Sequence, residues 1–325
     1  MIPVMIGVVV IVFTLMYLSP GDPAAIKLGT EVTEEGLAQL HEEMGLDRPY
    51  IIRLGDYIWG LVSRGDMGDS YRTGRAIKDE IVPRIKVTLK LAGISMVAGS
   101  LLGILLGIIS AVKQYSLLDK FTTIFALFGV STPSFWLALM FILLISMNLR
   151  LLPASGSYGP KYWILPCATL GYQAAGIIMR MTRSSMLEAI RQDFVTTARA
   201  KGQSESVIII RHVLRKSLIP IVTAIGNQFC VLLGGAVLVE SVFSLPGLGK
   251  YLIDGINNLD FPAVQSSVLV IALISVIVML ILDIVYSFID PRVKVAYQNT
   301  RIFGSGYRKI REKKTAKAGE GSDNG

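Results

Sequence analysis

The stretch FVTTARAKGQSESVIIIRHVLRKSLIP, from Phe194 to Pro220, is charged and lies between two long apolar runs. Charged residues make up only 17% of the 325-residue chain, whereas hydrophobic residues make up 52%. Soluble domains contain about 25% charged residues, so this composition indicates a membrane protein. A basic, helix-patterned segment of this length between two apolar runs is therefore the feature of the sequence that requires an explanation.

Apolar runs long enough to cross a bilayer as helices, which takes roughly 17–25 residues, recur along the chain. The six runs are Ile2–Leu18, Val87–Val112, Phe121–Met147, Trp163–Met181, Ile219–Val239 and Ala263–Ile289. They are too long for barrel strands, and an open sheet edge cannot satisfy its backbone in lipid. The predicted fold class is an all-α polytopic membrane protein with about six transmembrane helices.

The second apolar run carries glycines at a spacing of four residues, Gly99, Gly103 and Gly107. This spacing places the three glycines on one face of a helix, where the lack of side chains lets another backbone approach. The pattern predicts close helix–helix packing.

Charge asymmetry predicts the orientation of the chain. With six spans, both termini share one side with the Lys113–Lys120 and Arg183–Ser217 loops, which are rich in Lys and Arg. The segment Ser19–Arg84 lies on the other side, and there Asp and Glu outnumber Lys and Arg. By the positive-inside rule both termini are cytoplasmic. The net charge of +8 is then a consequence of topology, and nucleic-acid binding is not expected, because no basic patch is interleaved with stacking aromatics.

The runs divide the chain into predicted parts. These are a first transmembrane helix (1–18), an extracytoplasmic lobe (19–86), a five-helix core (87–290) with a cytoplasmic loop (184–218), and a basic tail (291–325) that we expect to be disordered. The first run could instead be a cleaved signal peptide. It lacks a basic start, and SPGDPAA is a poor cleavage site, so a retained helix is favoured.

No pattern of catalytic or metal-binding residues is recognisable. Cys167 and Cys230 both fall in predicted spans, and His41 and His212 fall on opposite sides of the membrane. The sequence GLGK at Gly247–Lys250 lacks the rest of a phosphate-binding loop. We therefore expect no cofactor, no metal and no catalytic residue, and any ATP chemistry must come from a partner.

The opening stretch predicts two helices joined by a glycine turn. A helix from Met186 to Lys201 would end at Gly202, and a second helix would begin at Ser204–Glu205. The expected apolar faces are Met186, Leu187, Ile190, Phe194 and Ala198 in the first helix, and Val207, Ile210, Val213, Leu214 and Leu218 in the second. One interpretation of this pair is an amphipathic hairpin that rests on lipid headgroups.

A second interpretation follows from a resemblance. TARAKG, with Ala198 and Gly202, followed by RHVLRKSLIP, resembles the EAA-type cytoplasmic loop of ABC-importer permeases, although Thr196-Thr197-Ala198 stands where the general pattern has Glu-Ala-Ala. This variant, and the long interval to Pro220, are similar to the dipeptide, oligopeptide and nickel branch of that family. LSPGDPAA, RPYIIRLGDYIWGLVSRGDMGDSY, STPSFWLALM, LLPASG, VESVFSLPGLGKYL and IDPRVK extend the resemblance over residues 1–294.

The resemblance implies a transport subunit in the cell membrane, not an enzyme. Such a permease is expected to pair with a second, different permease, above two cytoplasmic ABC ATPases and below an extracytoplasmic solute-binding protein. Short peptides or a nickel chelate are the substrates implied, and the sequence does not distinguish between them. The residues implied in ATPase coupling are Ala198, Arg199, Lys201, Gly202 and Glu205.

Three further residues are candidates for the translocation path. Asn227 and Gln228 form a polar pair in the fifth span, and helix–helix hydrogen bonding is the alternative role. Pro133 lies within the third span, where a kink could form a gate or could serve packing.

A different class of function, an ion-coupled secondary carrier without ATPase partners, is the alternative hypothesis. Such a carrier usually needs carboxylates inside the membrane. Asp283 is the one candidate, and it lies near the end of the last span.

The orientation can be tested with single cysteines. A cysteine introduced at Glu34 is expected to react with a membrane-impermeant thiol reagent added outside the cell, because 19–86 is predicted to be extracytoplasmic. A cysteine at Ser204 is expected to react only after the membrane is opened. Labelling in the reverse order would contradict the predicted topology.

Overall fold

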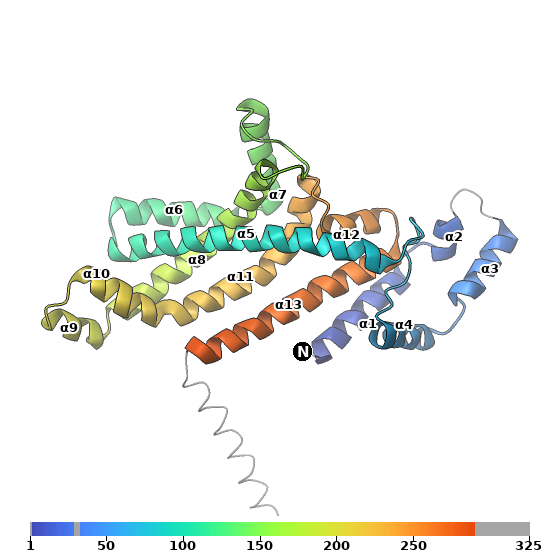
Figure 1. Ribbon diagram of the computed structural model, residues 1–325, viewed down its shortest axis with the longest axis horizontal. Helices are drawn as coiled ribbons and strands as arrows, with labels where there is room; N and C mark the ends of the chain where they lie inside the picture. Colours follow the sequence, from blue (N-terminus) through green and yellow to red (C-terminus); the bar gives the residue numbers. More distant parts are fainter. Residues whose placement is uncertain (1, 29–32, 290–325) are drawn as a thin grey trace, which may run out of the picture. The chain divides into compact units, whose positions relative to one another are not determined.

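The computed structural model describes residues 2–28 and 33–289, which are almost entirely helical (Figure 1). The α-helices are α1 (Ile2–Leu18), α2 (Pro23–Leu28), α3 (Glu34–Met44), α4 (Tyr50–Arg64), α5 (Ile77–Val112), α6 (Leu117–Ser131), α7 (Ser134–Phe141), α8 (Lys161–Ile190), α9 (Asp193–Ala200), α10 (Glu205–Val207), α11 (Arg215–Val242), α12 (Leu248–Asn257) and α13 (Phe261–Ile289). Two π-helical segments are η1 (Ile142–Asn148) and η2 (Ile208–Leu214). The predicted all-α class is confirmed, and the predicted disordered tail lies outside the described residues.

Three described helices are long and apolar enough to cross a membrane. They are Ile77–Val112, Glu205–Val242 and Phe261–Val285. A fourth candidate is the pair Leu117–Ser131 and Ser134–Asn148, which is bent by 107°. The predicted runs Ile2–Leu18 and Trp163–Met181 lie in α1 and α8. The fold therefore has the apolar helices of a polytopic membrane protein.

The chain divides into two units, and the second begins at Met279. The helices α1 to α12 and the first part of α13 belong to the first unit. Of the second unit, the structure describes the helical continuation of α13 as far as Ile289.

The contact between α5 and α8 confirms the packing predicted from the glycine spacing. A Cβ atom added at Gly99 would lie 2.6 Å from the carbonyl oxygen of Gly171, and one at Gly103 would lie 2.7 Å from that of Ala175. At Gly107 the added atom would lie 2.5 Å from Cβ of Thr182. Real carbon atoms do not approach so closely, so the two helices meet backbone to backbone only because these residues are glycines.

Helix α8 is also in close contact with α6. A Cβ at Gly176 would lie 2.7 Å from the carbonyl oxygen of Ala126 in α6. The hydroxyl of Tyr172 donates a hydrogen bond of 2.9 Å to the carbonyl of Phe125. The remaining side of α8 packs against α11 in a cluster of buried residues that includes Leu170, Ile178 and Leu233. The central position of α8 makes it the core of the first unit.

The third predicted run, Phe121–Met147, is not one continuous helix, and it is broken next to Pro133, where a kink was expected. Helix α6 ends at Ser131, and α7 begins directly after Pro133. Proline has no N–H and forces the preceding residue out of helical geometry, and Thr132 is accordingly extended, with φ −87° and ψ 126°. The side-chain amide of Gln173 donates a 2.6 Å hydrogen bond to the carbonyl that the break exposes at Thr132.

Helix α5 begins at Ile77 instead of the predicted Val87, and the loop before it is tied to the start of α13. The buried carboxylate of Asp260 accepts hydrogen bonds from the hydroxyl of Ser70 and from the backbone N–H of Tyr71, the latter at 3.1 Å. Residues far apart in sequence are thereby joined at one end of the unit. This junction forms one wall of a cavity in the lobe.

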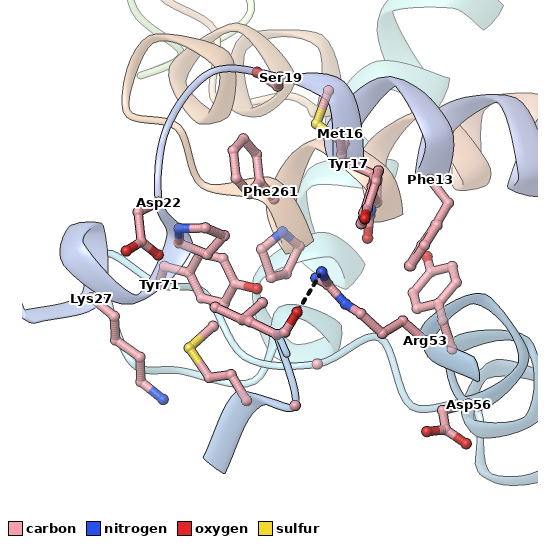
Figure 2. Close-up of a pocket in the computed structure, with 18 of the residues that line it drawn as sticks. Phe13, Met16, Tyr17, Ser19, Asp22, Lys27, Arg53, Asp56, Tyr71 and Phe261 are labelled. Atoms are coloured by element: carbon pink, nitrogen blue, oxygen red, sulfur yellow. Dashed lines mark hydrogen bonds between the residues drawn. The ribbon is translucent and has the colours of Figure 1, made fainter. Parts of the chain in front are cut away.

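The cavity has a volume of about 710 Å³ and lies among α1, the α2–α3 segment, α4 and the start of α13 (Figure 2). Aromatic side chains such as Phe13, Tyr71 and Phe261 line it. The guanidinium of Arg53 points into its middle and donates a long hydrogen bond of 3.4 Å to the carbonyl of Leu46. The 19–86 segment thus encloses the cavity together with α1 and the start of α13.

An ion pair at the edge of the cavity holds α3 to the start of α2. Nε2 of His41 lies 2.8 Å from the carboxylate of Asp22. The hydrogen bond to Asp22 raises the pKa of His41 above its ordinary value of 6.5. Burial raises the pKa of Asp22, but hydrogen bonds from His41 and the backbone N–H of Ala24 outweigh this effect, so its pKa is lowered below 3.8.

The glycine contact predicts that substitutions on one helix will differ sharply in effect. We expect Gly103→Ala to lower stability by roughly 1–3 kcal/mol, the usual cost of overpacking, because the added methyl would meet the backbone of α8. Gly93→Ala is the matched control, because no atom lies within 4 Å of the methyl it would add. Thermal unfolding of both variants in detergent measures the difference. Equal midpoints for Gly103→Ala and the wild type would contradict the close contact.

The ion pair predicts a titration that can be assigned directly, since the chain contains only two histidines. NMR of histidine-labelled protein is expected to give His41 a pKa above 6.5, and Asp22→Asn is expected to lower the pKa of His41. The stabilisation from His41 is fully present below its unfolded pKa and is lost as pH rises through its folded pKa. The contribution of Asp22 is lost as pH falls through its lowered pKa. A His41 pKa unaffected by Asp22→Asn would show that the pair is not formed.

Candidate functional site

The segment between α8 and α11 contains the helices predicted to couple this chain to a partner. The predicted continuous helix from Met186 to Lys201 is wrong in one respect. Helix α8 ends at Ile190, and α9 begins at Asp193 after an extended Gln192 (φ −82°, ψ 152°). In a straight helix Met186 and Val195 would lie on opposite faces, nine residues apart at 100° per residue. The break brings both side chains into one buried cluster.

This buried cluster joins the loop to the core. Its fully or nearly fully buried members are Ala111, Met186, Ala189, Val195, Ala198, Ile208 and Val213. They come from the end of α5, from α8, from α9 and from η2. Ala198 is only 8% exposed, so most of its small side chain packs within the chain. The loop is therefore a packed structure instead of a mobile connection.

Gly202 ends α9 as predicted. Its φ of +74° is in the left-handed region, which residues with a Cβ rarely adopt. The N–H of Gly202 bonds to the carbonyl of Arg199 at 2.9 Å, and the N–H of Gln203 bonds to that of Ala198 at 3.3 Å. These two bonds form a Schellman motif, which satisfies the last carbonyls of the helix and reverses the chain.

The charged residues of the loop lie on its surface. Arg199 and Glu205 face each other across the glycine turn, with Nε of Arg199 2.6 Å and Nη2 3.3 Å from the two carboxylate oxygens. Both side chains are about half exposed or more, and Lys201 is also exposed. The outward side of the loop thus carries a paired Arg–Glu and a lysine.

The second predicted helix exists, and its predicted apolar face is correct at Val213 and Leu214 but wrong at Val207 and Ile210. Helix runs continuously from Glu205 to Val242, and residues Ile208–Leu214 are π-helical. Ile208 and Val213 are fully buried, whereas Val207 and Ile210 are 41% and 64% exposed. A π-helix has hydrogen bonds between residues i and i+5, so residues five apart, such as Ile208 and Val213, share a face. The period of 3.6 residues that was used for the prediction holds for an α-helix, and it therefore assigned Val207 and Ile210 to the buried face.

The three path candidates lie in different surroundings. Gln228 is buried and Asn227 is exposed, so these neighbours do not share one environment. Pro133 lies at the 107° bend between α6 and α7. None of the three residues belongs to the buried cluster around α9, the proposed coupling helix.

Two buried carboxylates are structural features that the sequence analysis missed. Asp119 receives a bidentate pair of hydrogen bonds from Arg183, at 2.8 and 3.0 Å, and a further bond from the hydroxyl of Ser110. It therefore links the end of α5 and the start of α6 to α8, next to the coupling segment. The signal was available, since Ser116 and Asp119 have the spacing of a helix N-cap.

Glu240 is the second buried carboxylate, and it holds the short helix α12. It accepts hydrogen bonds from the hydroxyl of Thr88 at 2.6 Å and from the backbone N–H groups of Gly249 at 2.7 Å and Lys250 at 3.2 Å. A Cβ added at Gly247 would collide with this carboxylate. The glycines of the sequence PGLG, at Pro246–Gly249, are thus required for α12 to fold back onto α5 and α11.

Comparison with known proteins identifies the family. Residues 103–295 match the model of the binding-protein-dependent transport system inner membrane component, and residues 1–92 match the model of the N-terminal region of such membrane components. The dipeptide transport system permease protein DppB of Alkalihalophilus pseudofirmus is 40% identical over 322 residues, with 90% of this chain and 96% of that protein covered.

Other relatives have the same coverage. DppB of Escherichia coli K12 is 37% identical over 325 residues, and the glutathione transport system permease protein GsiC of Salmonella typhimurium is 37% identical over 294 residues. These relatives support the permease interpretation over that of an ion-coupled carrier.

Two solved structures share the fold. The inward-facing MetNI methionine ABC transporter matches with a TM-score of 0.57 at 17% identity, and covers 66% of this chain and 98% of its own. An amino acid ABC transporter solved with histidines matches with a TM-score of 0.52 at 16% identity, and covers 64% and 92%. The chain therefore belongs to the family of binding-protein-dependent transport system inner membrane components and is a multi-pass permease of that membrane.

Proposed function

We propose that this chain is one of two different permease subunits of an ATP-driven importer for short peptides. The observation that carries this proposal is the 37–40% identity, over 90% of the chain, to permeases named for dipeptide and glutathione transport. Dipeptides and glutathione are both short peptides, so this substrate class is the one that the relatives have in common. The chain itself supplies half of the translocation path and no ATP chemistry.

The proposed partners follow from the same assignment. A second permease would complete the path, two ABC ATPases would bind on the cytoplasmic side, and a solute-binding protein would deliver the peptide to the 19–86 lobe. Asn227, on the exposed surface of α11, and Pro133, at the bend, are proposed to line the path. Gln228 is the third path candidate, although its burial also suits packing between helices.

The geometry of the loop supports a role for α9 as the coupling helix. An ATPase would contact its exposed side, where Arg199, Lys201 and Glu205 lie around the Gly202 turn. The inward side, with Ala198, belongs to the cluster that joins α5, α8 and η2. A displacement of α9 by an ATPase would therefore be transmitted to three long helices at once, because packed interiors transmit strain.

Reconstitution tests the proposed function. The purified chain in liposomes is expected to show no ATPase activity and no peptide uptake. Addition of the second permease, the two ATPases and the peptide-loaded binding protein is expected to give ATP-dependent uptake of a dipeptide. Uptake driven by an ion gradient with this chain alone would contradict the proposal.

The coupling role predicts a specific defect at the turn. Gly202→Val places a β-branched residue at φ +74°, which costs roughly 1–2 kcal/mol or more in the left-handed region. We expect normal membrane insertion and permease pairing, reduced co-purification of the ATPases, and loss of transport. Since open space surrounds Gly202, the effect comes from the backbone and not from a collision.

Two further variants complete this test. Arg199→Glu should weaken ATPase binding less, because ion pairs between solvent-exposed side chains contribute little. Ser206→Val, which adds a comparable β-branched side chain at an exposed helical position, is the matched control and should leave transport unchanged. Full ATPase binding and transport in Gly202→Val would show that the loop is a hairpin resting on lipid.

A further inference from the structure

Helix α4 exposes a large apolar surface, although it lies in the segment that separates the first two spans. Ile51 is 78% exposed, Trp59 is 68% exposed and Val62 is 77% exposed. Ile51, Gly55, Trp59 and Val62 follow one another at intervals of four, four and three residues, which places them on one face of the helix. Exposure of such an apolar face to water is unfavourable, so something covers it.

The other sides of α4 have their own partners. Tyr50 stacks edge-on against Phe13 and Tyr17 of α1, with ring centroids 5.7 and 5.1 Å apart, and its hydroxyl is 2.6 Å from that of Thr14. Tyr57 contacts Phe13 from the next turns of α4, with centroids 5.6 Å apart. The polar side of α4 carries Arg53, which points into the lobe cavity (Figure 2). Hence α4 has one side on α1, one polar side, and one apolar side that is uncovered.

The contact with α1 sets the depth of α4. Helix α1 carries no charged residue from Ile2 to Leu18, so its whole length suits the hydrocarbon of the bilayer. Phe13 and Thr14, which lie before the last turn of α1, are then inside or next to the hydrocarbon. Because Tyr50 and Tyr57 touch this part of α1, α4 lies at the membrane boundary.

We propose that α4 is an interfacial helix, with Ile51, Trp59 and Val62 inserted in the lipid at the Leu18 end of α1. Helix α1, against which α4 packs, also exposes apolar side chains, since Leu15 is 57% and Leu18 is 71% exposed. Interfacial helices of this kind lie about 5–10 Å into the headgroup boundary, and tryptophan is enriched at that level. The lipid thereby supports the wall of the cavity, and a binding protein can reach only the remaining surface of the lobe.

Spin labels measure the surroundings of this face in the assembled transporter. Nitroxides are attached at Trp59→Cys and Val62→Cys, in a chain carrying Cys167→Ala and Cys230→Ala, and the complex is placed in liposomes. Asp56→Cys is the matched control, because Asp56 lies on the polar side of the same helix and is 63% exposed. Peptide uptake by each labelled complex shows that it has folded.

The expected result separates the two faces. Labels at 59 and 62 should be relaxed strongly by oxygen, which concentrates in lipid, and weakly by a water-soluble nickel chelate, and the label at 56 should show the reverse. Relaxation of 59 and 62 by the nickel chelate as strong as at 56 would overturn the proposal in favour of a water-exposed face. Relaxation by neither reagent would overturn it in favour of a protein partner, the second permease or the binding protein.

Discussion

The backbone contact between α5 and α8 is the constraint on which the rest of the first unit depends. Gly99, Gly103 and Gly107 allow the two helices to approach until backbone atoms touch along a line of three turns. Between helices in a membrane the hydrophobic effect contributes little, so close packing has to supply the association. This packing fixes α8 as the central helix, and α6 and α11 are then placed by their own contacts with it.

Each end of this helix pair is fastened by a buried carboxylate. At the end near the coupling segment Asp119 binds Arg183 and Ser110, and at the other end Glu240 binds Thr88 and the start of α12. A buried charge is stable only with partners that replace its water, and both carboxylates have several. The buried cluster around α9 is therefore attached to the α5–α8 pair, which is fixed at both ends. Such a rigid attachment suits a coupling helix that must transmit movement to the spans.

The sequence predicted the class of fold, the close glycine contact and the Gly202 turn, because each depends on local chemistry. The helical period identifies apolar runs, and a glycine after a helix is a direct signal of left-handed backbone. The errors have a different origin. The break at Gln192 and the π-helical turn at Ile208–Leu214 are settled by burial of Val195, Ile208 and Val213 in a tertiary cluster, which no local pattern contains. A kink at Pro133 was expected from the proline itself, but the sequence does not show that Gln173, far away along the chain, satisfies the carbonyl that the break exposes.

Polar residues within the apolar runs can now be divided by what they bind. Gln173, Thr88 and Glu240 each satisfy a backbone or side-chain group that a helix break or a helix start would leave unpaired. In lipid such a group has no water to bind, so these residues are needed for the fold whatever the chain transports. Their presence therefore says nothing about the substrate. Asn227 differs from them, because its side chain lies on the exposed surface of α11, where folding of this chain gives it no such task. This exposure suits our proposal that Asn227 lines the path, and it is the physical reason to propose Asn227 before Gln228.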